Sequence, residues 1–247
     1  MPECIRSTKL VLLPGMMCDE RMWAAQLRSV SALADIKVGD ITRCDSIAGI
    51  AASVLLQAPE YFSLAGLSMG GIVAMEMWRQ QPQRIERLAL LDTNFRADAP
   101  ERQAIRNRQI PAAAQGGLES ILRDELKPNY LAQEHRSNLA LLDELLQMGL
   151  DLGDDVFVRQ SLALRDRSDG TSTLPTISCP TLILCGAEDS LCPPSVHEEM
   201  AELIKGARLD IVPSCGHLST MEQPEYVNRV LSEWLSHPIR RQNNENK

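Results

Sequence analysis

The fold is decided by one stretch of the chain, Tyr61-Phe-Ser-Leu-Ala-Gly-Leu-Ser68-Met-Gly-Gly-Ile-Val-Ala-Met-Glu-Met-Trp-Arg-Gln-Gln-Pro82. Its first residues form a short apolar run, which predicts a buried β-strand over Tyr61–Leu67. Its second half has the pattern of a helix over Ile72–Gln81, and Pro82 stops this helix because proline has no amide hydrogen. A strand, a tight turn and a helix in this order predict one unit of an α/β fold.

The turn between that strand and that helix reads Gly66-Leu67-Ser68-Met69-Gly70. Gly-x-Ser-x-Gly in this position is the pattern of a nucleophile elbow, in which a strained turn lifts the serine hydroxyl above the edge of the sheet. Side chains at positions 66 and 70 would collide with neighbouring backbone, so both are glycine. The first amides of the helix would then point to the place where an oxyanion forms. The alternative is an ordinary strand–helix turn with Ser68 as its N-cap.

Strands and helices alternate on both sides of this unit. Further strands are predicted over Lys9–Pro14, Ile36–Ile41, Ile85–Thr93, Thr181–Cys185 and Arg208–Val212. Helices are predicted from Asp19 to about Leu33 and over Ser46–Gln57, Ser195–Ile204 and Gln223–Ser236. Because parallel strands joined by helices need right-handed crossovers, this alternation predicts an α/β fold with a parallel sheet.

The alternation stops between residues 95 and 174, where the sequence is polar and shows no convincing strand. Four helices are predicted there, over Pro100–Ile110, Gly117–Leu126, Leu131–Gly149 and Asp154–Leu164. We therefore predict a core made of residues 1–94 and 175–239 with an inserted helical cap, residues 95–174. The polar end, residues 240–247, is expected to be disordered.

Two loops that follow later strands carry the remaining chemistry. Asp189 comes directly after one predicted strand, and His217 lies in the loop after the next. A serine hydroxyl is a weak nucleophile and needs a base, and a neutral imidazole needs a carboxylate that holds its tautomer. The carboxyl ends of parallel strands share one edge, where distant residues can meet. The order Ser68, Asp189, His217 therefore predicts a catalytic triad.

Each triad assignment has an alternative. Asp189 alone could cap the helix that follows it, and His217 alone could be a loop residue bonded to backbone. Asp92 also stands at the end of a predicted strand and is the competing acid, with Glu188 as a weaker candidate. The other histidines are expected on helix surfaces or in the tail, in contact with solvent: His135, His197 and His237.

Composition argues against several classes of function. The formal net charge of −8 argues against a nucleic-acid partner and against an anionic membrane surface. No run approaches the roughly 18 apolar residues of a membrane span, and no signal peptide is evident, so a cytoplasmic protein is expected. Seven scattered cysteines fit a reducing compartment better than a disulfide framework. No metal-spaced His/Cys cluster, Gly-x-Gly-x-x-Gly or P-loop occurs, so neither a metal nor another cofactor is expected.

The chain resembles the α/β-hydrolase-fold superfamily and is similar to its compact carboxylesterases, which include pimeloyl-carrier-protein methyl ester esterases. The matching residues are Leu12-Leu-Pro-Gly15, Gly66-Leu-Ser-Met-Gly-Gly71, Leu90-Leu-Asp-Thr93, Leu184-Cys-Gly-Ala-Glu-Asp189, and Gly216-His217 with Glu222-Gln-Pro224. The resemblance covers nearly the whole chain except residues 95–174, where that superfamily places a variable cap. The usual His-Gly after the first core strand is Pro14-Gly15 here. The superfamily's N-terminal hairpin has no room before Lys9, so we expect about six parallel strands rather than eight mixed ones.

The resemblance implies a serine esterase mechanism. His217 would remove the proton of Ser68, whose Oγ attacks an acyl carbonyl, while Asp189 orients the imidazole. The backbone amides of Met16 and Met69 would hold the oxyanion. Water would then hydrolyse the acyl-Ser68 intermediate.

The substrate is expected to be a small-molecule acyl ester, with a thioester or a C–C bond as alternatives on the same triad. Three methionines are candidate substrate-binding residues, although methionine is more often core filler: Met16, Met17 and Met69. Three cysteines lie close in sequence to the predicted oxyanion loop, the acid and the base: Cys18, Cys192 and Cys215. They either pack as small apolar side chains or make the site sensitive to oxidation. A ligand receptor with slow or no turnover is the alternative from another class, and a homodimer is possible.

Overall fold

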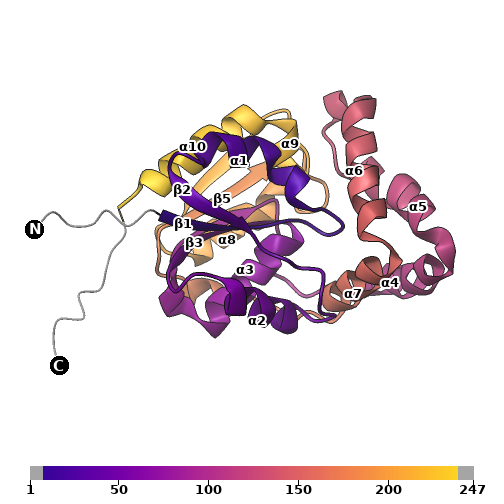
Figure 1. Ribbon diagram of the computed structural model, residues 1–247, viewed down its shortest axis with the longest axis horizontal. Helices are drawn as coiled ribbons and strands as arrows, with labels where there is room; N and C mark the ends of the chain where they lie inside the picture. The colour runs from indigo at the N-terminus through magenta and orange to yellow at the C-terminus, as the bar shows by residue number, and fades with distance from the viewer. Residues whose placement is uncertain (1–7, 239–247) are drawn as a thin grey trace, which may run out of the picture.

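A computed structural model describes residues 8–238, so the tail predicted for residues 240–247 lies outside the described residues. Six parallel strands form one sheet in the order β2-β1-β3-β4-β5-β6 (Figure 1). They are β1 (Thr8–Leu13), β2 (Ala34–Val38), β3 (Phe62–Leu67), β4 (Ile85–Leu91), β5 (Thr181–Gly186) and β6 (Arg208–Val212). The predicted α/β fold with about six parallel strands is therefore confirmed.

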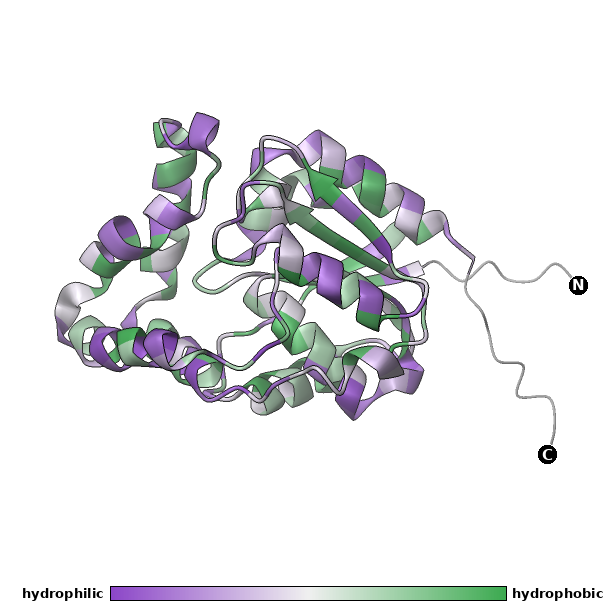
Figure 2. Cartoon of the chain, turned by 180° about the vertical axis from the view of Figure 1, so that it is seen from behind, coloured by the Kyte–Doolittle hydropathy of each residue, from purple (hydrophilic) through white to green (hydrophobic). Residues whose placement is uncertain are grey.

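Helices cover both faces of the sheet, because successive residues of a strand point to opposite sides. Leu10 and Leu12 belong to the buried cluster that packs under α1 (Ala24–Val30) and α10 (Pro224–Ser236). Val11 and Leu13 belong to the cluster on the other face. That face is covered by α2 (Ile47–Gln57), α3 (Met69–Gln80) and α8 (Pro194–Leu203). Figure 2 shows the hydrophobic colour concentrated on the strands between these two layers.

Short helical segments connect these elements. A 3-10 helix over Glu20–Trp23 leads into α1, and α9 (Ser219–Glu222) leads into α10. Further 3-10 turns cover Pro82–Arg84 and Leu174–Thr176. The helix after β3 begins at Met69, three positions earlier than predicted, because it starts inside the Gly-x-Ser-x-Gly turn.

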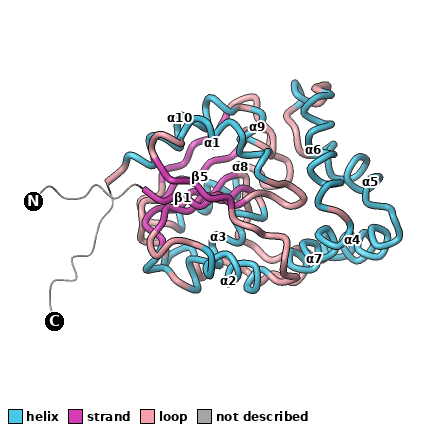
Figure 3. The backbone as a smooth tube through the Cα atoms, viewed as in Figure 1, coloured by secondary structure: helices cyan, strands magenta, loops and turns pink. Residues whose placement is uncertain are grey.

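Between β4 and β5 the chain forms only helices and loops, and Figures 1 and 3 show this part as an arm beside the sheet. We call residues 95–174 the cap. Its longer helices are α4 (Pro100–Ala112), α6 (Leu139–Leu152) and α7 (Asp154–Arg165). Between α4 and α6 lie a kinked segment over Ala113–Gly117, α5 (Leu118–Ser120), a π-helical segment over Ile121–Leu126, and 3-10 turns over Lys127–Asn129 and Gln133–His135. All the structured elements of the predicted cap segment are thus helical, while its status as a separate domain stays a prediction.

Two helix boundaries in the cap differ from the prediction. Helix α4 continues through Pro111 to Ala112, and the chain then kinks where Gln115 and Gly116 leave the helical conformation. The helix predicted from Leu131 begins only at Leu139. Residues 130–132 instead form hydrogen bonds with the loop of His217, and these long-range bonds outweigh local helix propensity.

Among residues 8–238, no helix is both long enough and apolar enough to span a membrane.

Candidate active site

Ser68 lies at the junction of β3 and α3 in a strained backbone conformation, with φ of 54° and ψ of −116°. The neighbouring glycines are required by close backbone contacts: a Cβ at Gly66 would lie 2.2 Å from the Gly70 carbonyl oxygen, and one at Gly70 would lie 2.3 Å from the Leu13 carbonyl oxygen. The Ser68 side chain makes no capping hydrogen bond to the helix. The alternative of a plain N-cap is therefore wrong, because Oγ points to another partner.

That partner is His217, in the loop after β6. Its Nε2 lies 2.9 Å from Ser68 Oγ, and its Nδ1 lies 2.7 Å from Asp189 Oδ2. A carboxylate only accepts, so Nδ1 carries the proton and Nε2 is free to accept from the serine hydroxyl. Asp189 and His217 are 2 % and 4 % exposed, whereas Ser68 is half-buried. The structure thus brings together the three residues predicted to form the triad, with only the serine open to solvent.

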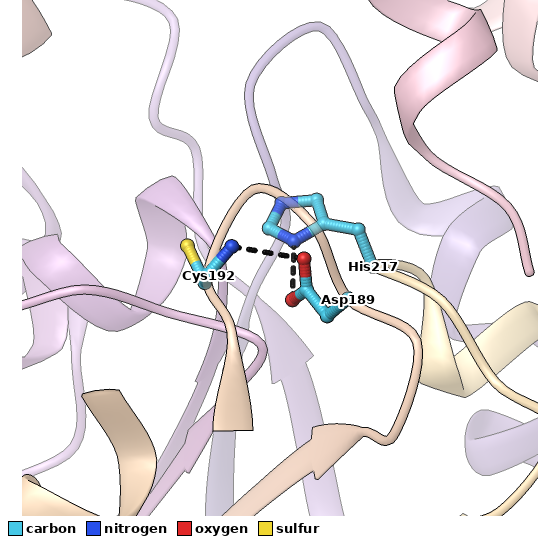
Figure 4. A group of neighbouring side chains, drawn as sticks. All are labelled: Asp189, Cys192 and His217. Carbon is cyan, nitrogen blue, oxygen red and sulfur yellow. Dashed lines mark hydrogen bonds and ion pairs between the residues drawn. The ribbon is translucent and has the colours of Figure 1, made fainter. Parts of the chain in front are cut away.

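Asp189 is held by backbone as well as by His217. Its Oδ1 accepts hydrogen bonds from the amides of Leu191 and Cys192, both at 2.9 Å. Figure 4 shows the carboxylate between the Cys192 amide and the His217 ring. Each oxygen therefore has a separate task, since Oδ1 anchors the side chain and Oδ2 orients the imidazole.

The pKa of His217 reflects this partnership. Burial alone would lower the pKa of the imidazole, but the charge of Asp189 and its hydrogen bond raise it above its ordinary value of 6.5. Asp189 thus stabilises the imidazolium form, which is the form that a general base adopts after taking a proton.

Asp92, the competing acid predicted from the sequence, forms its hydrogen bonds with other groups than the imidazole nitrogens. Its Oδ1 accepts from the Gly186 amide at 3.0 Å, and its Oδ2 accepts from the Ser219 amide at 3.1 Å and from the Ser219 hydroxyl. Burial and the charge of Asp189 raise the pKa of Asp92 to about 8. Asp92 therefore ties together the loops that carry Asp189 and His217 and is not the hydrogen-bond partner of the histidine. Glu188 is exposed and accepts from the Gln133 amide.

Two of the remaining histidines differ from the prediction that they contact solvent. His197 is fully buried, and its Nε2 accepts from the Thr93 amide at 3.0 Å. Burial lowers the pKa of His197 to about 4, so it remains a neutral acceptor. His135 is partly buried, with Nδ1 2.9 Å from a carboxylate oxygen of Glu222. The pattern of the surrounding sequence does not reveal the burial of these two histidines, because their partners, Thr93 and Glu222, lie far away along the chain. His237 is exposed as expected.

The loop of His217 is anchored to the cap, which the sequence analysis did not foresee. The His217 amide donates to the Tyr130 carbonyl at 2.7 Å. Glu222 accepts from the Gly216 amide through Oε1 at 2.9 Å and from the Ala132 amide through Oε2 at 2.7 Å. Glu222 stands in the Glu-Gln-Pro motif quoted above, which is the only sequence signal for this contact.

Of the two residues whose amides are predicted to hold an oxyanion, Met69 follows Ser68 directly and Met16 follows Gly15, which lies beside Ser68. Met69 is the first residue of α3, so its amide has no acceptor within the helix. Met16 follows Gly15, where an added Cβ would lie 3.6 Å from Ser68 Cβ. Neither amide forms a hydrogen bond with another group in the part of the chain that the structure describes, whereas the Met17 amide donates to Gln160 Oε1.

The three methionines differ in environment. Met17 is buried in a cluster with cap residues such as Phe157, and Met16 packs partly against the same cluster. Met69, the first residue of α3, is buried in the core. Met16 is thus the most exposed of the three beside Ser68.

The cysteines near the site are buried thiols. The possible metal ligands of Asp189, Cys192 and His217 all lie within 4.8 Å of one another. However, burial and the charges of Asp189 and Asp92 raise the pKa of Cys192 well above 9, and a thiol must lose its proton to bind a metal. Burial likewise raises the pKa of Cys18 and of Cys215. The buried, protonated thiols of these cysteines are therefore suited to packing in the interior rather than to metal binding or thiol chemistry.

Several known proteins are similar to this chain in sequence. A putative carbamate hydrolase RutD from Yersinia enterocolitica is 28% identical over 193 residues, which are 77% of this chain and 68% of that protein. The biotin biosynthesis bifunctional protein BioHC from Cellvibrio japonicus is 24% identical over 242 residues, which are 91% of this chain and 47% of that protein. This chain thus spans about two thirds of the first protein and about half of the second.

A thermophilic esterase from Thermogutta terrifontis, solved with malate bound, superposes with a TM-score of 0.85 and 30% identity. The superposition covers 92% of this chain and 89% of that one. Residues 10–230 match the alpha/beta hydrolase family. Since this match runs from β1 into α10 and includes the elbow and both loops that meet it, the chain belongs to the alpha/beta hydrolase family and is a hydrolase of that fold.

Proposed function

We propose that this protein is a serine hydrolase that cleaves a carboxylic ester of a small acyl substrate through an acyl-Ser68 intermediate. One observation carries the proposal: a buried imidazole joins the half-buried hydroxyl of Ser68, at 2.9 Å, to the anchored carboxylate of Asp189, at 2.7 Å. This arrangement converts a weak nucleophile into a reactive one at neutral pH.

The reaction would proceed in two halves. His217 Nε2 takes the hydroxyl proton as Oγ of Ser68 attacks the carbonyl carbon, and the Met16 and Met69 amides hold the developing oxyanion. The protonated imidazole then gives its proton to the leaving alcohol. In the second half His217 activates water, which attacks the acyl carbon and releases Ser68.

Carboxylic esters are the favoured substrate class for two reasons. The chain is 30% identical to a thermophilic esterase over most of both chains. The arrangement also needs only an acyl carbonyl and a leaving group that accepts a proton, which an ester offers. Thioesters meet the same requirement and remain the alternative substrate.

The proposal predicts covalent capture of one serine. A fluorophosphonate should lose fluoride to Ser68 Oγ, so that mass spectrometry finds one phosphonyl group on the peptide that contains Ser68. The same protein should hydrolyse p-nitrophenyl esters of short acids over many turnovers, and the labelled protein should not. A single slow turnover would instead indicate a ligand receptor, and absence of labelling would exclude a reactive serine.

The raised pKa of His217 predicts the acid limb of the pH profile. The base must be neutral to accept a proton, so kcat/KM should fall about tenfold per pH unit below the pKa of His217 and level off above it. The midpoint should lie above 6.5, because the charge and hydrogen bond of Asp189 raise the pKa of His217 despite its burial. Initial rates with a p-nitrophenyl ester from about pH 5 to pH 9 test this, corrected for the ionisation of the product. A plateau that extends to pH 5 would contradict the role of His217.

A further inference from the structure

The turn that carries Met16 is held from behind by a glutamine of the cap. Gln160, in α7, is fully buried, and its Oε1 accepts a hydrogen bond from the Met17 amide at 2.8 Å. Its Nε2 lies 3.4 Å from the carbonyl oxygen of Ile41, in the loop after β2, and donates to it. One cap side chain therefore bridges two loops at the carboxyl edge of the sheet.

The turn has a conformation that its own residues do not favour. The Cys18 amide donates to the Gly15 carbonyl at 3.2 Å, which closes a four-residue turn. Met17, its third residue, has φ of 55°, whereas Met16 does not have a positive φ, so the turn is of type II. Glycine is preferred at that third position because a Cβ is crowded at positive φ. Met17 therefore needs support from outside the turn.

Gln160 gives that support at the peptide that distinguishes the two common turn types. Types I and II differ by a flip of the central peptide, which here joins Met16 to Met17. In the observed orientation the Met17 N–H faces Gln160 Oε1. After a flip, the Met16 carbonyl oxygen would take its place, and two acceptors would face each other. The hydrogen bond therefore selects type II.

The same turn lies against the nucleophile. A Cβ at Gly15 would be 3.6 Å from Ser68 Cβ. The Gly15 carbonyl is engaged by Cys18, and in a trans peptide the N–H points opposite to the C=O. The Met16 amide therefore points out of the turn and stays available to another acceptor.

We propose that Gln160 is a positioning residue for the oxyanion site: it locks the Gly15–Cys18 turn so that the Met16 amide is aimed at the oxyanion formed on Ser68. This role rests on the proposed function. No pattern in the sequence points to Gln160, which lies 143 positions from Met17 in the helical insert.

Gln160→Met tests the role, because it removes both hydrogen bonds at nearly constant side-chain length. We expect kcat for a p-nitrophenyl ester to fall about tenfold to a hundredfold, with KM changed less than about threefold, since an oxyanion donor acts in the transition state. Affinity for a boronic acid, whose tetrahedral adduct on Ser68 Oγ places an oxygen at the same amides, should fall by a similar factor. Gln160→Glu, which burial keeps protonated, retains an oxygen at the Met17 amide and a donor toward the Ile41 carbonyl, so it should retain most of kcat.

A rescue separates turn conformation from general packing. Adding Met17→Gly to Gln160→Met should restore part of kcat, because glycine adopts positive φ without support. Adding Met17→Ala removes nearly as much volume but keeps the Cβ, so it should restore nothing. Ser161→Ala is the control in the same helix, since the Ser161 hydroxyl is buried without a partner among the described residues and its loss should leave kcat unchanged.

The outcomes are distinct. If the wild-type protein shows neither labelling of Ser68 nor ester turnover, the proposed function fails and this role fails with it. If the wild-type protein is active and Gln160→Met keeps its kcat and boronic acid affinity, the role of Gln160 alone is overturned. Equal rescue by Met17→Gly and Met17→Ala would also overturn it. Where Gln160→Met does not fold, Gln160→Asn carries the same prediction, because its amide is one carbon too short to reach Met17.

Discussion

Ser68→Ala is expected to lower kcat for ester hydrolysis by about a million-fold, to a residual rate that the oxyanion amides and substrate binding keep about a thousandfold above the uncatalysed one. Without Oγ there is no nucleophile, and the orientation of His217 and Asp189 no longer contributes, because the three groups act as a unit. This loss is measured with end-point assays after long incubation, with a p-nitrophenyl ester at saturating concentration and with protein free of wild-type enzyme.

The loss should occur without unfolding. Alanine keeps the backbone amide bond of residue 68 to the Leu91 carbonyl and removes only one hydrogen bond, to a side chain. We expect the free energy of unfolding to change by about 1 kcal/mol or less. Ser214→Ala is the matched control, since Ser214 also has a positive φ, of 49°, and is exposed. A Ser68→Ala protein that folds and retains more than about 1% of kcat would rule out Ser68 as the nucleophile.

Asp189→Asn is expected to lower kcat by about ten-thousandfold. The amides of Leu191 and Cys192 both donate to Oδ1, so they would hold the oxygen of the asparagine in that place. Its NH2 group would then face His217 Nδ1 and donate to it. The histidine proton would move to Nε2, which could no longer accept the proton of Ser68.

Asp92→Asn is the matched comparison, because both acids are buried and lie in neighbouring loops. Asp92 contacts neither ring nitrogen of His217, so its replacement should lower kcat by only about tenfold, through the loops that it connects. Thermal unfolding of both variants shows whether a loss of activity comes from a loss of structure. A larger loss from Asp92→Asn than from Asp189→Asn would reverse the assignment of the acid.

The fold could be predicted from the sequence where the controlling interactions are local. The glycines around Ser68 are required by backbone atoms within a few residues or on the adjacent strand. The runs of β3, β4 and β5 are apolar because both faces of a parallel sheet are covered, and such runs are visible without coordinates. These central strands of the sheet follow from such signals.

Predictions failed where a distant segment competes with local preference. The sequence predicts a helix from Leu131, yet Ala132 donates to Glu222 and the neighbouring Tyr130 accepts from the His217 amide. His197 has the position of a surface residue but accepts from the Thr93 amide in the interior. In both cases the deciding partner lies far away along the chain, and no nearby residue reveals it.

The sequence by itself determined the α/β fold and the elbow at Ser68, and it placed His217 and two candidate acids at the same edge of the sheet, because apolar runs, glycines and the order of residues at strand ends act through backbone geometry. Only the tertiary structure decided that Asp189 rather than Asp92 faces His217, and that Gln160 supports the turn of Met17. Those choices depend on the directions of side chains brought together across long loops. Such directions are set by packing among many residues and are not encoded in any short stretch of sequence.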